Sequence, residues 1–245
     1  MSRNLVSYGL QYAGYFIEAG LVFYLVWSRQ WTRRRSVAFY LTSLLAVELS
    51  RAFTLHKYGL DSLQYYYIYW CTDFLLAGIT FALVCFFFRR ACSHEEKLWR
   101  SVRLLLVFVF VLVLGVSGFC FSRNISHLFN IFIVEFNQDL YFTCLVLNTL
   151  LYLLLQQLES ADEELGLLVC GVGIQFAGPA ATLALVHLTG SERFSQSLNS
   201  FTIPLCTVGM LLVWSYAIVG VRTKAIKLAR REVPVMAEAT VTLRV

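Results

Sequence analysis

The feature that most constrains this chain is a succession of seven apolar stretches, each close to the roughly 20 residues that a helix needs to cross a bilayer. They cover residues 8–27, 37–55, 65–88, 104–121, 128–158, 165–188 and 201–221. Such stretches form helices, because a backbone inside lipid must satisfy its own hydrogen bonds. The sequence therefore predicts an all-α polytopic membrane protein: a seven-transmembrane-helix bundle over residues 1–221 and a short basic tail over residues 222–245.

Composition excludes the main alternatives to a membrane protein. Hydrophobic residues make up 58% of the 245 residues and charged residues only 14%, whereas soluble proteins carry about 25% charged residues. There is no long polar tract of the kind seen in disordered chains, and the seven cysteines lie mostly within apolar stretches rather than in a secreted disulfide framework. We expect no nucleic-acid partner. The first stretch lacks a signal-peptide cleavage site, so we expect it to stay as an anchor.

The distribution of Lys and Arg predicts the orientation. Fifteen of the 20 basic residues follow the first, third and seventh stretches, and only four fall at the opposite ends. Positively charged loops stay cytoplasmic, so the N-terminus is predicted to be outside and the C-terminus inside. One cytoplasmic loop is acidic, with Glu159, Asp162, Glu163 and Glu164. We interpret it as a solvated turn, with contact to the basic loop around residues 89–103 as the alternative.

Four charged residues fall at membrane depth in the predicted spans: Glu18, Glu48, Arg51 and Asp73. Each costs at least ~2.5 kcal/mol at membrane depth, so each needs a partner, a cavity or a function. We expect them to converge in the outer half of the bundle, between the first three helices, with Arg51 pairing with Glu48 or with a neighbour. One interpretation is a proton-titrating or cation-binding pocket. The other, which we prefer, is a structural polar clasp.

Two further groups are candidates at the outer surface. Tyr69 and Trp70 belong to an aromatic run typical of an interfacial belt, although a small ligand could stack on them beside Asp73. Glu135 and Asp139 belong to a polar cluster near the start of the fifth stretch. That stretch is too long for one crossing, so we expect its spanning part to begin near residue 140. The two acids could hold a cation, but an ordinary interfacial turn is preferred.

The basic tail after residue 221 has the alternation of an amphipathic helix on the inner leaflet. Its candidate contacts with anionic lipid are Arg222, Lys224, Lys227, Arg230 and Arg231. The same segment could instead dock a protein partner.

The sequence lacks the residues that several kinds of membrane chemistry require. No Lys lies within an apolar stretch to bind retinal, and the four His lie at helix ends or in loops, which argues against haem or a membrane zinc site. No catalytic motif is present. We therefore expect no catalytic residues, no metal, no cofactor and no enzyme activity.

Short patterns give a resemblance. They are Glu18, the run ELSR at residues 48–51, the run YYYIYW at residues 65–70 followed by Asp73, and Trp214 with Tyr216. With these the chain resembles a group of uncharacterised bacterial seven-helix integral membrane proteins. The resemblance implies a bacterial inner-membrane location and no established activity. The outline is also similar to the seven-helix membrane input modules of bacterial sensors. We expect no kinase or cyclase domain after the seventh helix, so we expect any output to need a separate partner.

Three functions remain open. The first is a receptor-like or accessory sensory module with a polar group in its outer half, which acts through a partner. The second is a proton- or cation-coupled transporter of a small solute, which the few polar groups in the inner halves of the helices disfavour. The third is a structural subunit of a membrane complex.

Overall fold

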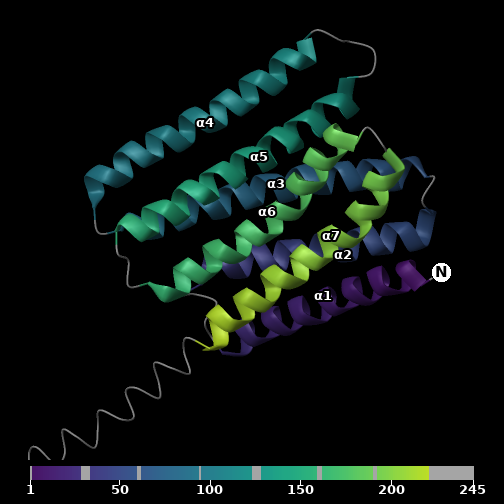
Figure 1. The fold of residues 1–245 in the computed structure, drawn as a ribbon, viewed down its shortest axis with the longest axis horizontal. Coiled ribbons are helices and arrows are strands. Elements are labelled where there is room, and N and C mark those ends of the chain that lie inside the picture. Colours follow the sequence, from purple (N-terminus) through teal and green to yellow (C-terminus); the bar gives the residue numbers. More distant parts are fainter. Residues whose placement is uncertain are drawn as a thin grey trace, which may run out of the picture.

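The computed structural model describes residues 2–28, 34–59, 62–93, 95–122, 128–158, 162–189 and 192–220, and within them it is all-helical (Figure 1). The helices are α1 (Ser2–Trp27), α2 (Arg35–Tyr58), α3 (Leu63–Ala91), α4 (Glu96–Ser122), α5 (Leu128–Gln157), α6 (Glu163–Thr189) and α7 (Glu192–Ser215), and a π-helical turn (Tyr216–Gly220) continues α7. Each predicted apolar stretch falls on one of these helices. The all-α prediction is confirmed.

Five segments of the described residues are long and apolar enough to cross a membrane. They are Arg35–Tyr58, Leu63–Ala91, Glu96–Gly115, Asp139–Gln157 and Phe201–Gly220. The chain is therefore a membrane protein with several spanning helices. Neither α1 nor α6 is among the five, so a count of seven crossings remains a prediction.

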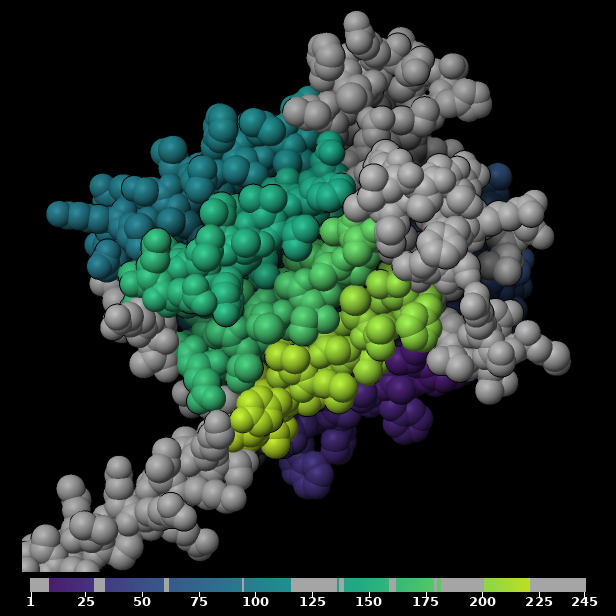
Figure 2. Space-filling view, viewed as in Figure 1, coloured from purple at the N-terminus to yellow at the C-terminus, as the bar shows by residue number. Residues whose placement is uncertain are grey.

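The helices pack as a bundle of long, roughly aligned rods (Figure 1). α4 lies at one edge and packs mainly against α5, while α5 also contacts α3 and α6. The most extensive contact joins α6 and α7, and α1 packs against both α7 and α2. Figure 2 shows α4, α5, α6 and α7 in succession across one face, with α1 at the far edge. The first and last helices are thus neighbours.

The turn between α2 and α3 is fixed by local chemistry. Gly59 ends α2 with a φ of 79°, a conformation that suits glycine, and its N–H donates to the Leu55 carbonyl at 3.0 Å. Ser62 then caps α3, its hydroxyl accepting from the Tyr65 N–H at 3.2 Å. The short connection makes α2 and α3 an antiparallel pair, which brings the predicted acidic and basic residues of these helices side by side.

Candidate functional site

Glu18 and Glu48 meet inside the bundle. Glu18, on α1, is only 1% exposed, and its carboxyl group lies within hydrogen-bonding reach of the carboxyl group of Glu48 on α2. Among the described residues, Glu18 Oε1 and Glu48 Oε2 are buried oxygens without a hydrogen-bond partner. Two carboxylates in contact repel each other, and a shared proton or a bound cation relieves that repulsion.

Glu18 and Glu48 both lie inside their helices rather than at an end. Glu48 is 13 residues from the start of α2, about 20 Å at 1.5 Å per residue. Glu18 is nine residues from the end of α1, about 14 Å. The expected place of the pair in the outer half of a membrane bundle remains a prediction. The hydroxyl of Tyr15, which accepts a hydrogen bond from Gln11 at 3.0 Å, lies close to the pair.

Arg51 takes a different partner from the acid on its own helix. Its Nη2 lies 3.2 Å from Asp73 Oδ1 on α3, and its Nε donates to Thr72 Oγ1 at 2.8 Å. Nη2 also donates to the Tyr69 carbonyl at 3.2 Å. Of the two pairings left open by the sequence, the structure has the one with a neighbour, Asp73. Arg51 still lies about one turn from Glu48, so its charge acts on the acid pair only from a distance.

The aromatic candidates surround this ion pair. The Arg51 guanidinium carbon lies 4.4 Å from the centre of the Tyr69 ring, a cation–π contact. Trp70 makes edge contacts with Tyr69 and Tyr66 at centroid distances of 5.6 and 6.1 Å. One face of Tyr69 is therefore occupied by the chain's own arginine. Ligand stacking on these rings remains a prediction.

A second polar layer lies nearer the basic end of α2. The Tyr40 hydroxyl donates to Gln175 Oε1 on α6 at 2.9 Å, and the Tyr40 ring contacts Trp214 edge-on at 5.5 Å. The Trp214 indole N–H donates to the Leu168 carbonyl at 3.0 Å. These contacts tie α2, α6 and α7 together. We did not predict these contacts from the sequence. A tyrosine or glutamine within an apolar stretch does not indicate which residue it will hydrogen-bond to.

The predicted cytoplasmic end holds a buried network of ion pairs. Arg34, at the start of α2, has its Nε 2.8 Å from Glu164 Oε1, and its Nη1 donates to the Ile218 carbonyl at 3.1 Å. Both side chains are almost fully buried. Arg90 lies 2.8 Å from Asp162 Oδ2, and Asp162 also caps α6 by accepting from the Leu165 N–H.

The interpretation of the acidic loop as a solvated turn is therefore wrong for Asp162 and Glu164. The antiparallel packing brings the loops of one end together, and opposite charges there pair. The sequence did contain an indication of this pairing. The basic loops that predict the orientation lie at the same end of the bundle as this acidic loop. The alternative, contact with the basic loop, is correct for Asp162 through Arg90. Contact with Arg34 was not expected.

The remaining candidates lie largely outside the described residues. Asp139 is half-buried on α5, and the side chain of Glu135 lies outside the described residues. So do the tail candidates Arg222, Lys224, Lys227, Arg230 and Arg231. Within the described ranges, no three metal-ligating side chains form a cluster.

No protein-family model, curated protein or solved structure matches this chain.

Proposed function

We propose that this chain is a seven-helix sensory module of the bacterial inner membrane, with its N-terminus outside. It responds to protons or to a small cation at Glu18 and Glu48, and it acts through a protein partner at its basic end. The observation that carries the proposal is the contact between the buried carboxyl group of Glu18 and the half-buried one of Glu48, each with one buried oxygen that has no hydrogen-bond partner among the described residues.

This arrangement favours a responsive site over the structural clasp that we preferred from the sequence. A clasp needs opposite charges or satisfied hydrogen bonds. The donors of the nearest base, Arg51, are directed to Thr72, Asp73 and the Tyr69 carbonyl instead. When the pair holds one proton, the carboxyl groups bind each other. When it loses that proton without gaining a cation, two negative charges face each other between α1 and α2 and push the helices apart.

Helix α2 connects this acid pair with the ion pairs at the basic end of the bundle. α2 carries Glu48 near its middle and follows directly after Arg34. Arg34 binds Glu164 at the start of α6 and the Ile218 carbonyl in the π-helical turn after α7. A rigid helix that shifts at Glu48 also shifts at Arg34, so the state of the acid pair biases the ion pairs at the basic end.

The transporter alternative finds less support. A transporter needs a wet path from the acid pair to both surfaces. Between Glu48 and Arg34, the side chains of Leu25, Leu41 and Val84 are fully buried and apolar. The polar groups described in this region include the Tyr40 hydroxyl and the nearby Thr80 hydroxyl, and both are already hydrogen-bonded within the bundle, to Gln175 and to the Leu76 carbonyl. A site that is closed toward one surface suits sensing better than transport.

The test compares Glu18→Gln with Glu96→Gln, which removes an exposed carboxylate at the start of α4. The protein is reconstituted in nanodiscs, and two signals are followed as the pH is raised. Infrared difference spectra report protonated carboxyl groups, and hydrogen exchange reports opening of the segment around Glu164. In the wild type and in Glu96→Gln we expect loss of a protonated-carboxyl band together with faster exchange near Glu164. Glu18→Gln should show neither.

The proposal fails if the wild type has no such band, or if Glu18→Gln retains the pH-dependent exchange. A proteoliposome assay separates sensing from transport. The sensory module should give no proton flux under an imposed potential, whereas flux that is abolished by Glu18→Gln would establish the transporter.

A further inference from the structure

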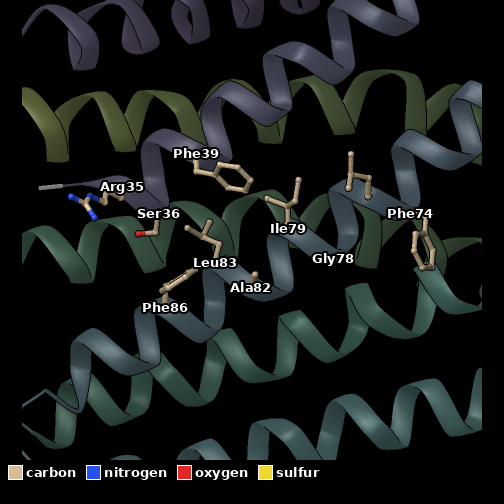
Figure 3. Close-up of a pocket in the computed structure, with 10 residues that line it drawn as sticks. Arg35, Ser36, Phe39, Phe74, Gly78, Ile79, Ala82, Leu83 and Phe86 are labelled. Carbon is tan, nitrogen blue, oxygen red and sulfur yellow. The ribbon is translucent and has the colours of Figure 1, made fainter. Parts of the chain in front are cut away.

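An open groove of about 830 Å³ runs along the outside of the bundle between α2 and α3. Figure 3 shows it in close-up, with Arg35 and Ser36 at one end and Phe74 at the other. Its walls are apolar between these ends, with Phe39 and Phe86 near the polar end. Neither Glu18 nor Glu48 lines the groove, so its occupancy does not depend on the proposed function.

The dimensions of the groove fit one lipid chain. Phe74 and Phe86 both line it and are 12 residues apart on α3, which corresponds to about 18 Å. One leaflet contributes about half of a hydrocarbon core about 30 Å thick. The groove therefore extends from the headgroup level of one leaflet to about the bilayer centre. Gly78 lines it, and a Cβ added at Gly78 would meet no atom within 4 Å. Because glycine has no side chain, the groove is deeper at this position than it would be with a larger residue.

The polar end carries a positive charge that the protein does not neutralise within the described residues. Arg34 is buried and paired with Glu164, whereas its neighbour Arg35 is exposed, lines the groove and forms no ion pair among the described side chains. The Ser36 hydroxyl lies beside it. Arg89 follows Phe86 by three residues on α3, so it faces the same side one turn further on. A guanidinium with a neighbouring hydroxyl suits a phosphate group.

We propose that this groove is a binding site for one anionic glycerophospholipid, whose acyl chain lies along α3 and whose phosphate binds Arg35 and Ser36. The positive charge of Arg35 favours an anionic headgroup, and the apolar walls of the groove bind the acyl chain. Binding at this site also holds α2 and α3 together on the face where no other helix covers the groove.

Two variants address the two parts of the site separately. Arg35→Gln removes the charge, and its control is Arg100→Gln, an exposed arginine on α4 outside the groove. Gly78→Phe fills the floor of the groove. Its control is Gly20→Phe on α1, where an added Cβ also meets no atom within 4 Å. Far-UV circular dichroism and elution as a single species confirm that each variant folds.

Native mass spectrometry then measures how much lipid stays bound. Phosphatidylglycerol or phosphatidylcholine is added to protein in mild detergent. For the wild type we expect one retained phosphatidylglycerol and weaker retention of phosphatidylcholine. Arg35→Gln should lose about fivefold in phosphatidylglycerol retention, the factor expected for one basic residue at an anionic lipid surface. Its retention of phosphatidylcholine should fall less, because the choline cation already offsets the charge of the phosphate.

Gly78→Phe should weaken retention of both lipids, because it excludes the chain whatever the headgroup. The two controls should behave as the wild type. The proposal is overturned if the wild type shows no preference for phosphatidylglycerol, or if Arg35→Gln and Gly78→Phe both retain it as the wild type does. It is also overturned if the control substitutions reduce retention equally.

Discussion

Replacing Gly171 with alanine tests a close contact between α6 and the end of α7. A Cβ at this position would lie 2.5 Å from Cδ1 and 2.6 Å from Nε1 of Trp214. Carbon atoms pack at about 3.5–4.0 Å, so the indole must retreat by about 1 Å. Trp214 is fully buried, and its N–H already donates to the Leu168 carbonyl at 3.0 Å. The retreat therefore strains the packing and lengthens this hydrogen bond.

The expected destabilisation follows from these contacts. Overpacking a tight core costs about 1–3 kcal/mol, and a hydrogen bond between membrane helices contributes about 0.6 kcal/mol. Against this, alanine favours a helix over glycine by up to about 1 kcal/mol. Gly166→Ala on the same helix is the matched control, since its Cβ meets no atom within 4 Å and it shares the gain in helix propensity. We expect Gly171→Ala to be about 2–4 kcal/mol less stable than Gly166→Ala.

The assay is unfolding in mixed micelles of mild detergent and dodecyl sulfate, followed by circular dichroism and tryptophan fluorescence. Adding Trp214→Phe to Gly171→Ala should restore part of the lost stability, because the smaller ring leaves room for the methyl group. If Gly171→Ala and Gly166→Ala unfold within about 0.5 kcal/mol of each other, the contact between Gly171 and Trp214 does not constrain the bundle as argued.

Two further predictions use the same assay. Arg34→Ala should lower the free energy of unfolding by about 3 kcal/mol, because it leaves the buried Glu164 carboxylate without its main partner; Arg90, 3.7 Å from that carboxylate, keeps the loss at the low end of the usual range. Arg35→Ala is the control and should change stability by less than about 0.5 kcal/mol, so equal losses would contradict the assignment. Tyr40→Phe keeps the buried ring and removes one hydrogen bond, so a loss near 1 kcal/mol is expected, and no loss would show that this bond does not stabilise the bundle.

The sequence was sufficient to predict that the helices exist, but not where each helix begins and ends. Apolar stretches of spanning length identify α1 to α7, because lipid leaves the backbone no alternative to a helix. The helices continue beyond these stretches into polar residues, as α7 does when it begins at Glu192 rather than near Phe201. Polar residues at an interface form helices as readily as loops, so hydropathy marks the spanning part and not the whole helix.

The sequence could not predict which charged residues would pair with each other inside the bundle. The isolated acids on α1, α2 and α3 were recognisable, because charges are rare in apolar stretches. Which acid would bind Arg51 depends on the rotation of α2 against α3, and hydropathy does not determine that rotation. The pairing of Arg34 with Glu164 spans 130 residues of sequence. Only the way the helices meet in three dimensions, which brings side chains of α2 to α6 and to the end of α7, reveals it.

The contact between α1 and α7 has a consequence for how the protein is made. A chain that enters the membrane from its N-terminus delivers α1 first and α7 last, so the bundle cannot close until synthesis of the spanning region is complete. Until α2 arrives, the carboxyl group of Glu18 has no Glu48 to share a proton with, and a lone charged carboxylate in lipid is costly. The contact between Glu18 and Glu48 therefore forms as soon as α2 packs against α1, whereas the contact between α1 and α7 forms last.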